Sequence, residues 1–227
     1  MPNDASQPRF LGEKWRLVRR IASKKGLKPD ILILEKTGER MVAKDFREKN
    51  FFARCLWGPL NLRYEKFILD RLDGVAEIPR VIGFEDCNCL LLSWLDGEGI
   101  KARSQQLDEN FFPRLFAIIE AIHQRGVLHL DLGHKSNIMV DAAGRPQVID
   151  FNISLYLPPY RFFRPLFKLL ARVDYYSVLR LKVKYRPQDC SPEERRKVEK
   201  FLKLRKLWIF DRLVRKLTNL GKSNPAP

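Results

Sequence analysis

The segment at residues 129–151, HLDLGHKSNIMVDAAGRPQVIDF, places a histidine, two aspartates and an asparagine in two loops around a short hairpin. NIMV and PQVID have the composition of short strands, and Ala143-Gly144 between them is typical of a turn. A hairpin with polar groups at both of its ends could carry a phosphoryl-transfer site. The alternative is an ordinary polar hairpin, because aspartate is also a common turn residue.

The sequence before this segment predicts two further hairpins. Residues 30–46 contain two β-type runs around Thr37-Gly38, and residues 78–97 contain two more around Asp86–Asn88. WLDGEG, at residues 94–99, follows the second hairpin and is the expected crossing point between a β-rich first part and a mostly helical second part.

Helical periodicity occurs on both sides of the 129–151 segment. After Pro159 the pattern is helical to the end, apart from a break at Pro187–Pro192. Two earlier helices are expected to end at Gly74 and Gly126, and their apolar faces are formed by Tyr64, Phe67, Ile68 and Leu72 in the first and by Phe112, Leu115, Phe116, Ile119 and Ile122 in the second. The sequence therefore predicts an α+β protein. We expect a flexible tail at 1–12, a β-rich unit at 13–95, a helical unit at 96–218 and a second flexible tail at 219–227.

Composition is that of a globular protein. Hydrophobic residues make up 45% of the 227-residue chain, and no apolar run approaches the 18 residues of a membrane span. The N-terminal MPNDASQPRF lacks the apolar core of a secretory signal. The four cysteines have no zinc-site spacing, so reduced thiols in a cytoplasmic protein are expected.

The net charge of +16 is concentrated in the C-terminal quarter. Residues 161–216 contain 18 Lys and Arg against six Asp and Glu, whereas residues 1–160 contain 24 against 21. This asymmetry predicts an anionic partner for one face: membrane headgroups, nucleic acid or a phosphorylated substrate.

The chain also contains the residue types that phosphoryl transfer requires. A cation must hold the nucleotide phosphates, oxygen ligands must hold Mg²⁺, and a carboxylate must orient the attacking hydroxyl. Lys44 ends a predicted strand, and Glu65 on the following helix could pair with it. Asp131 is a candidate base. Asn137 and Asp150 bracket the small hairpin and offer the oxygen ligands that Mg²⁺ prefers.

Each of these residues, taken singly, has an ordinary explanation. Lys44 is compatible with a surface strand lysine, Glu65 with a helix carboxylate, and His129 with a packed, hydrogen-bonded histidine. His123 and His134 have no metal-ligand spacing. The order of the whole set is more specific than any of its members.

The ordered set resembles the protein-kinase-like superfamily over about residues 15–180. VAK at Val42–Lys44 is similar to the strand-borne lysine motif, HLD…N at His129–Asn137 to the catalytic loop, and IDF at Ile149–Phe151 to the metal-binding motif. Asp174 lies only 24 positions after Asp150, so a long activation segment does not fit. The resemblance is to the compact bacterial branch of RIO-like kinases and lipopolysaccharide core sugar kinases.

The resemblance implies a bilobal fold with a β-rich N-lobe, a reduced helical C-lobe, ATP and Mg²⁺ as cofactors, and a role for each residue. Asp131 is implied as catalytic base, and Asn137 and Asp150 as metal ligands. Lys44 is implied to bind phosphate, with Glu65 bracing it. His129 is implied to be structural and Asp174 to support the catalytic loop. Main-chain groups at Ser93, Trp94 and Leu95 are implied to contact adenine.

The catalytic loop departs from the family pattern in its length. Five residues separate Asp131 from Asn137 instead of four, which predicts a bulge at Gly133–Ser136. Leu130 stands where an arginine is usual, so control by a phosphorylated activation loop is not expected. Asn152 replaces the glycine of the metal motif, and asparagine tolerates a positive φ better than most residues.

The nucleotide loop departs further, because RRIASKKGLKPD contains Gly26 alone in place of a glycine-rich motif. Gly26 is the candidate nucleotide-loop residue, and Lys24 and Lys25 could contact phosphates in its place. A solvated basic turn is the alternative.

The leading hypothesis is an ATP-dependent kinase that phosphorylates a hydroxyl of a lipid-linked glycan, such as lipopolysaccharide core, at the inner membrane face. Its membrane contact is expected from the basic C-terminal helices, where Leu207, Phe210, Val214 and Leu217 form an apolar stripe. A helix packed on the protein is the alternative for that stripe. The alternative functions are a RIO-like serine/threonine protein kinase whose basic tail contacts RNA, and a catalytically inactive kinase-like binding module.

Overall fold

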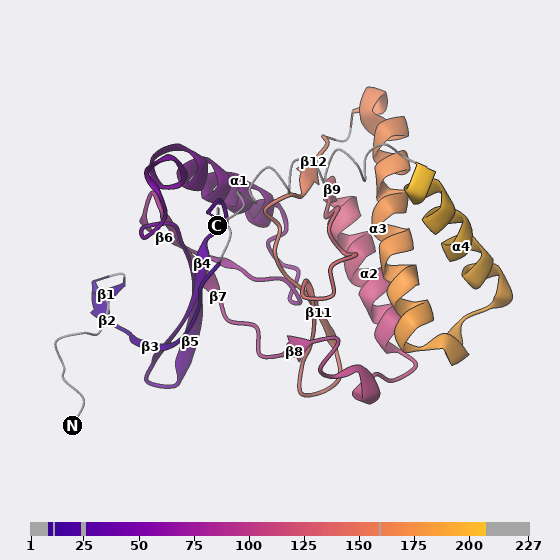
Figure 1. Cartoon of the computed structure of the whole chain (residues 1–227), viewed down its shortest axis with the longest axis horizontal. Coiled ribbons are helices and arrows are strands. Elements are labelled where there is room, and N and C mark those ends of the chain that lie inside the picture. Colours follow the sequence, from indigo (N-terminus) through magenta and orange to yellow (C-terminus); the bar gives the residue numbers. More distant parts are fainter. Residues whose placement is uncertain (1–8, 11, 24–25, 159, 208–227) are drawn as a thin grey trace, which may run out of the picture.

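The protein is an α+β fold, as the sequence predicted, with an antiparallel sheet at one end and packed helices at the other (Figure 1). The structure is a computed structural model, and it describes residues 9–10, 12–23, 26–158 and 160–207. Within these residues no helix has the length and apolar character needed to cross a membrane. The predicted C-terminal stripe between Leu207 and Leu217 lies, apart from Leu207, outside the described residues.

The main sheet has five antiparallel strands in the order β3-β4-β5-β7-β6. Both predicted hairpins are confirmed. The first turns at Thr37 and Gly38, which adopt φ of 48° and 85°, and the second turns at Cys87-Asn88. The strands are β3 (Arg16–Ile21), β4 (Asp30–Lys36), β5 (Glu39–Asp45), β6 (Val81–Asp86) and β7 (Cys89–Ser93).

Alternation along β5 divides its side chains between two cores. Met41 and Ala43 pack on the outer face of the sheet with Phe10 and Trp15. Because successive strand residues point to opposite faces, Val42 and Lys44 face the other way. Val42 joins the larger core there, so the sequence MVAK directs its lysine toward the interior between the sheet and the rest of the chain.

Helix α1 (Gly58–Arg71) packs against the inner face of the sheet and follows a π-helical turn, η2 (Ala53–Trp57). Gly58 permits a close approach, because a Cβ there would lie 2.7 Å from Cγ of Phe46. The helix predicted here is confirmed, but its predicted face is partly wrong, since Tyr64 and Phe67 are 37% and 38% exposed. The buried face follows Leu62, Glu65, Ile68 and Leu69, at spacings of three and four residues.

Three long helices lie between residue 111 and residue 207, where the description of the chain ends. The chain passes through β8 (Glu98–Gly99) and the turn η3 (Ser104–Gln106) before the first of them. α2 packs on α3, and α4 packs on the far side of α3 (Figure 1). The predicted break is confirmed by the short turn η5 (Pro187–Asp189). The helices are α2 (Phe111–Gln124), α3 (Arg164–Tyr185), which begins after the turn η4 (Arg161–Phe163), and α4 (Pro192–Leu207).

Short strands place the 129–151 segment between the sheet and the helices. β10 (Ile138–Val140) and β11 (Pro146–Val148) form the small hairpin that the sequence predicted, and β8 pairs with β10 on its other side. β9 (Val127–Leu128) pairs with β12 (Leu155–Tyr156). One core runs through both halves and includes Phe46 and Leu90 as well as Phe112 and Val178. β1 (Arg9–Phe10) and β2 (Glu13–Lys14) form a separate pair.

Candidate functional site

Lys44 lies at the centre of an ion-pair chain that joins the two halves of the protein. Its Nζ is 2.6 Å from Oε1 of Glu65 on α1 and 2.9 Å from Oδ1 of Asp150. Oε1 of Glu65 also accepts the backbone N–H of Phe151, at 3.2 Å. The pair that the sequence predicted between strand and helix is therefore present, and the metal-motif aspartate joins it.

Burial and charge act in opposite directions in this chain. Burial alone would lower the pKa of the Lys44 ammonium, but the carboxylates of Glu65 and Asp150 outweigh it and raise that pKa. Burial would raise the pKa of Asp150, and Lys44 reverses the effect and lowers it. Both groups are therefore charged at neutral pH, with the cation held between two anions.

Asp131 and Asn137 contact each other in the segment that resembles a catalytic loop. Nδ2 of Asn137 donates to Oδ2 of Asp131 at 2.8 Å and to its backbone carbonyl at 3.1 Å. The backbone N–H of Ile149 donates to the carbonyl of Asn137 at 3.0 Å, so Asn137 lies beside the strand end that carries Asp150. The two ends of the hairpin thus bring the candidate base and both candidate metal ligands into one region.

The additional loop residue is accommodated in two consecutive turns. The N–H of His134 donates to the carbonyl of Asp131, and the N–H of Asn137 donates to the carbonyl of His134, each at 3.0 Å. The carbonyl of Gly133 accepts from Arg180 on α3 at 2.8 Å. Gly133 does not supply a positive φ, since the left-handed residues nearby are Leu130 at 62° and Asp150 at 69°. Asn152, expected to need that conformation, does not adopt it either.

Asp174 on α3 holds this unusual backbone in place. Its carboxylate is fully buried and accepts the N–H groups of His129 at 2.8 Å and Leu130 at 2.7 Å. His123 on α2 lies 3.0 Å from the same carboxylate. A non-glycine residue at positive φ is strained, so these hydrogen bonds compensate for the conformation of Leu130. The supporting position predicted for Asp174 is confirmed.

His129 is a packed, neutral histidine. Burial lowers the pKa of its imidazole, and its ring lies 4.7 Å from that of Phe151, between centroids. Nε2 is 3.2 Å from the carbonyl of Ile149, and Nδ1 accepts the N–H of Asp131 at 3.3 Å. These partners fit the tautomer with its proton on Nε2. His129 therefore links Asp131, the candidate base, to the residue before Asp150.

The donor set at Asn137 and Asp150 fits magnesium. Both offer hard oxygen atoms, and Lys44 contacts only Oδ1 of the Asp150 carboxylate, whose side chain is 30% exposed. Magnesium characteristically binds one or two protein oxygens together with phosphate oxygens and water. Asn137, 3% exposed, directs its amide nitrogen to Asp131 and leaves Oδ1 to accept from Ser136 at 3.1 Å. Asn137 and Asp150 are the residues that would hold the ion.

The predicted adenine segment is partly engaged within the protein. The N–H of Ser93 donates to the carbonyl of Arg80, and Oγ of Ser93 accepts from the N–H of Arg80, each at 2.8 Å. The main-chain N–H of Ser93 is therefore engaged within the protein, and the contact with adenine stays a prediction. Trp94 and Leu95, both half-buried, continue in an extended segment toward β8.

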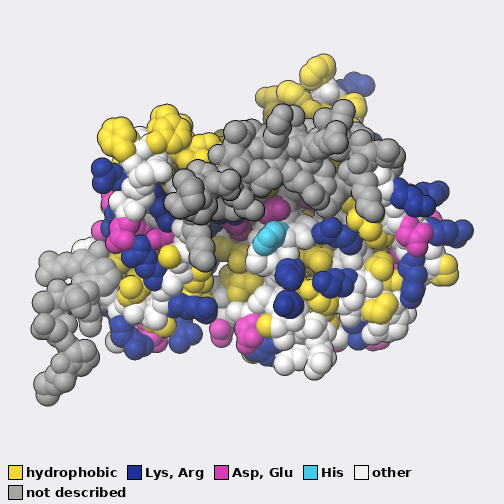
Figure 2. All heavy atoms as spheres, in the orientation of Figure 1, with side chains coloured by type: hydrophobic (Ala, Val, Ile, Leu, Met, Phe, Trp, Pro, Cys, Tyr) yellow, Lys and Arg dark blue, Asp and Glu magenta, His cyan; other side chains and the backbone are white. Residues whose placement is uncertain are grey.

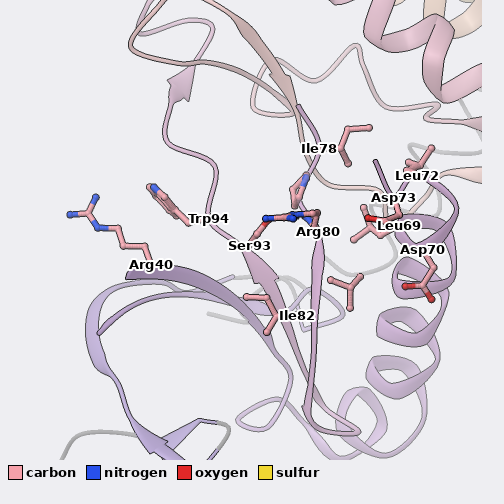
Figure 3. A pocket seen from close by; sticks show the side chains of 12 residues that line it. Arg40, Leu69, Asp70, Leu72, Asp73, Ile78, Arg80, Ile82, Ser93 and Trp94 are labelled. Atoms are coloured by element: carbon pink, nitrogen blue, oxygen red, sulfur yellow. The ribbon is translucent and has the colours of Figure 1, made fainter. Parts of the chain in front are cut away.

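A cavity of about 590 Å³ lies beside this segment (Figure 3). Arg40 and Trp94 line one side, with the Arg40 guanidinium 5.9 Å from the Trp94 ring centroid, and the end of α1 lines the other. Arg80 and Ser93 lie between them. The cavity is separate from the Lys44–Asp150 pair, and only its Ser93–Trp94 edge adjoins the predicted site.

The loop between β3 and β4, the candidate nucleotide loop, is anchored at Asp30. Its carboxylate accepts from the N–H of Ser23 at 2.9 Å, from Arg20 at 2.6 Å and from Lys49. Gly26 is exposed, and Lys24 and Lys25 lie outside the described residues. Lys28, which sequence reasoning missed, is exposed, and its charge contributes to lowering the pKa of Asp150. The available signal was its position, only three residues after Lys25 in the same loop.

No protein-family model matches the sequence, and no curated protein shows significant sequence similarity to it. The functional argument therefore depends on the geometry of the site and on the motif order.

Proposed function

We propose that the protein is an ATP- and Mg²⁺-dependent kinase with a compact, bilobal protein-kinase-like fold. The observation that carries the proposal is the Lys44 ion-pair chain, in which one buried cation contacts both the carboxylate of α1 and the carboxylate after the small hairpin. A cation in this position can contact nucleotide phosphates, and Asp150 can hold the metal that neutralises them. Asp131 would then orient the acceptor hydroxyl and accept its proton.

The acceptor we propose is a sugar hydroxyl of a lipid-linked glycan such as lipopolysaccharide core. Resemblance to that subgroup supports it, as does the basic C-terminal quarter of the chain, which favours an anionic, membrane-bound substrate. A RIO-like protein kinase and an inactive binding module are the competing functions, and the experiment below separates them.

The test is transfer of the γ-phosphoryl group from radiolabelled ATP, in the presence of Mg²⁺, to purified lipopolysaccharide or to a generic protein substrate. Label in the glycan supports the proposal, and label only in the protein substrate favours the RIO-like alternative. Asp131→Asn preserves shape while removing the base, and we expect turnover to fall by about 10²–10⁴-fold. Asp96→Asn, at an exposed position in the crossing segment, is the matched control.

Two results would contradict the proposal. Undiminished turnover in Asp131→Asn would show that the base is elsewhere. Absence of any thermal stabilisation by ATP with Mg²⁺ would favour the binding-module alternative, because a ligand that binds only the folded state must stabilise it.

A further inference from the structure

The outer surface of η2 and α1 carries large apolar side chains that no core residue covers. Phe51 is 76% exposed, Phe52 54%, and Leu60 56%. Leu56 and Trp57 are also exposed on this surface, at 52% and 42%. Fully burying such a side chain stabilises a protein or complex by about 1.5–3 kcal/mol. A cluster of exposed apolar side chains therefore indicates a surface that binds a partner molecule or a membrane.

A second apolar cluster lies where the chain enters α3. Phe162 is 85% exposed, and Tyr160 is 67% exposed. Leu166 and Leu169, in the first two turns of α3, are 45% and 50% exposed. This cluster follows the metal-motif segment directly in sequence, and Tyr64 of α1 donates a hydrogen bond to the carbonyl of Ser154 in that segment at 2.8 Å.

The two clusters project from the same edge of the molecule. Figure 2 shows hydrophobic side chains at the upper edge, over the start of α1 on the left and over the start of α3 on the right. They are separate protrusions on one side of the protein. An extended, nearly flat partner that lies along this edge would face both clusters.

The charges interleaved with these clusters are all positive. No Asp or Glu occurs between Glu48 and Glu65, or between Asp150 and Asp174. The first interval contains Lys49, Arg54 and Arg63, and the second contains Arg161, Arg164, Lys168 and Arg172. Of these seven residues, all except Lys49 are exposed. Aromatic and aliphatic side chains mixed with Lys and Arg, without carboxylates, match the interface of an anionic bilayer.

The same charges disfavour two other occupants. Residues 208–227 contain four Lys and Arg against one Asp, so this segment of the chain has the same sign as the face. A second copy related by two-fold symmetry would place the face against itself and oppose its own cations.

We propose that the exposed residues of segments 51–63 and 160–169 form one docking face for an anionic lipid surface. The apolar side chains enter the boundary between headgroups and acyl chains, and the arginines and lysines contact phosphate headgroups. This face, rather than the apolar stripe predicted from Leu207 to Leu217, is the principal membrane contact. The proposal does not depend on phosphoryl transfer, since a binding module with this surface would dock in the same way.

The test is flotation of the full-length protein with vesicles of phosphatidylcholine alone or of phosphatidylcholine and phosphatidylglycerol at 3:1. We expect flotation with the anionic vesicles only, and a decrease at high salt because charges are then screened. Arg161→Gln with Arg164→Gln should lower the partition coefficient about 30-fold, at about 1 kcal/mol for each arginine. Phe51→Ser with Phe162→Ser should lower it at least as much.

Two matched controls separate this face from the basic C-terminal quarter. Arg196→Gln with Lys200→Gln removes two exposed cations from α4, and Arg212→Gln with Arg215→Gln removes two after Leu207. Each should change partitioning less than the face variants. The proposal is overturned if wild type does not float with anionic vesicles, or if either control pair abolishes flotation while the face variants retain it. It is also overturned if the face variants act by dissociating a dimer in size-exclusion chromatography.

Discussion

Asp30 organises the β3–β4 loop through its own side chain. Burial would raise the pKa of its carboxyl, but hydrogen bonds from Lys49, Arg20 and the backbone of Ser23 lower it to about 2. The anion is therefore strongly favoured in the folded state. A loop with a single glycine is held at its two ends in this way.

Asp30→Asn should destabilise the protein at pH 7 by about 1.5–3 kcal/mol, the usual contribution of hydrogen bonds to a charged group. Because the folded-state pKa is depressed, this stabilisation is complete above about pH 4 and is lost as the pH falls toward 2. The difference in the free energy of unfolding between wild type and variant, measured by urea denaturation, should decrease over the same pH range.

Glu48→Gln is the control for Asp30→Asn, since Glu48 also pairs with Arg20 but its side chain is 68% exposed. Its effect should stay below about 1 kcal/mol at every pH. An equal effect of the two substitutions would show that burial of Asp30 is unimportant.

At the level of single residues, the sequence predicted the charged groups better than their contacts. Lys44, Glu65 and Asp150 could be identified because their order along the chain is characteristic. The hydrogen bonds of Ser93 with Arg80 and of His123 with Asp174 could not, because they depend on which segment lies opposite in space. Positive φ at Leu130 also has no local signal, since leucine rarely adopts it, whereas Asp150 is of a residue type that adopts it more often.

Gly126, after the end of α2, lets two elements approach closely. It adopts a φ of +74°, and a Cβ there would lie 2.8 Å from the carbonyl oxygen of Leu157. The N–H of Leu157 donates to the carbonyl of Gly126 at 2.9 Å, which begins the β9–β12 pair. The glycine thus permits both the helix end and the strand contact that follows it.

Gly126→Ala should destabilise the protein by at least about 2 kcal/mol. The left-handed conformation accounts for about 1–2 kcal/mol of this in a non-glycine residue, and the contact with Leu157 adds to it. Gly83→Ala in β6 is the matched control, because no atom lies within 4 Å of its Cβ position. It should change the free energy of unfolding by less than about 0.5 kcal/mol. Similar thermal shifts for the two variants would refute this explanation.

Helices and strands could be predicted where the apolar periodicity is strong. Which face of a helix is buried was predicted less well. The hairpins around Thr37-Gly38 and Cys87-Asn88, the helices α1 and α2, and the break at Pro187 all follow local signals of turn residues and apolar spacing. The predicted buried face of α1 was partly wrong, because Tyr64 and Phe67 do not belong to the core. They lie on the outer surface, where Phe67 packs against Tyr156 and Arg71.

At the scale of the whole molecule, Lys44 connects the sheet to the helical half. Lys44→Met should lower the free energy of unfolding by about 3–5 kcal/mol, because Glu65, 1% exposed, would keep a buried charge without its cation. Urea denaturation would measure the change. If the protein is the kinase that we propose, stabilisation by ATP with Mg²⁺ should be lost in the same variant, since Lys44 would no longer contact the phosphates.

Lys66→Met, in α1, is the matched control for Lys44→Met. Lys66 pairs with Asp70 four residues along α1, and both side chains are substantially exposed. A change of less than about 0.5 kcal/mol is expected. The bridging role of Lys44 would be refuted if Lys44→Met lowered the free energy of unfolding no more than Lys66→Met does.

The ion pair between Lys44 and Asp150 joins residues that are 106 positions apart in the chain. A contact between residues so far apart closes a long loop, which costs conformational entropy of the chain. Such contacts generally form late in folding, because structure that is already formed reduces this cost. Neither the isolated sheet nor the isolated helices would contain the three-residue charge chain. A chain whose two halves have not yet come together therefore lacks this charge chain. If the protein binds nucleotide as we propose, that binding would report on complete folding of the molecule.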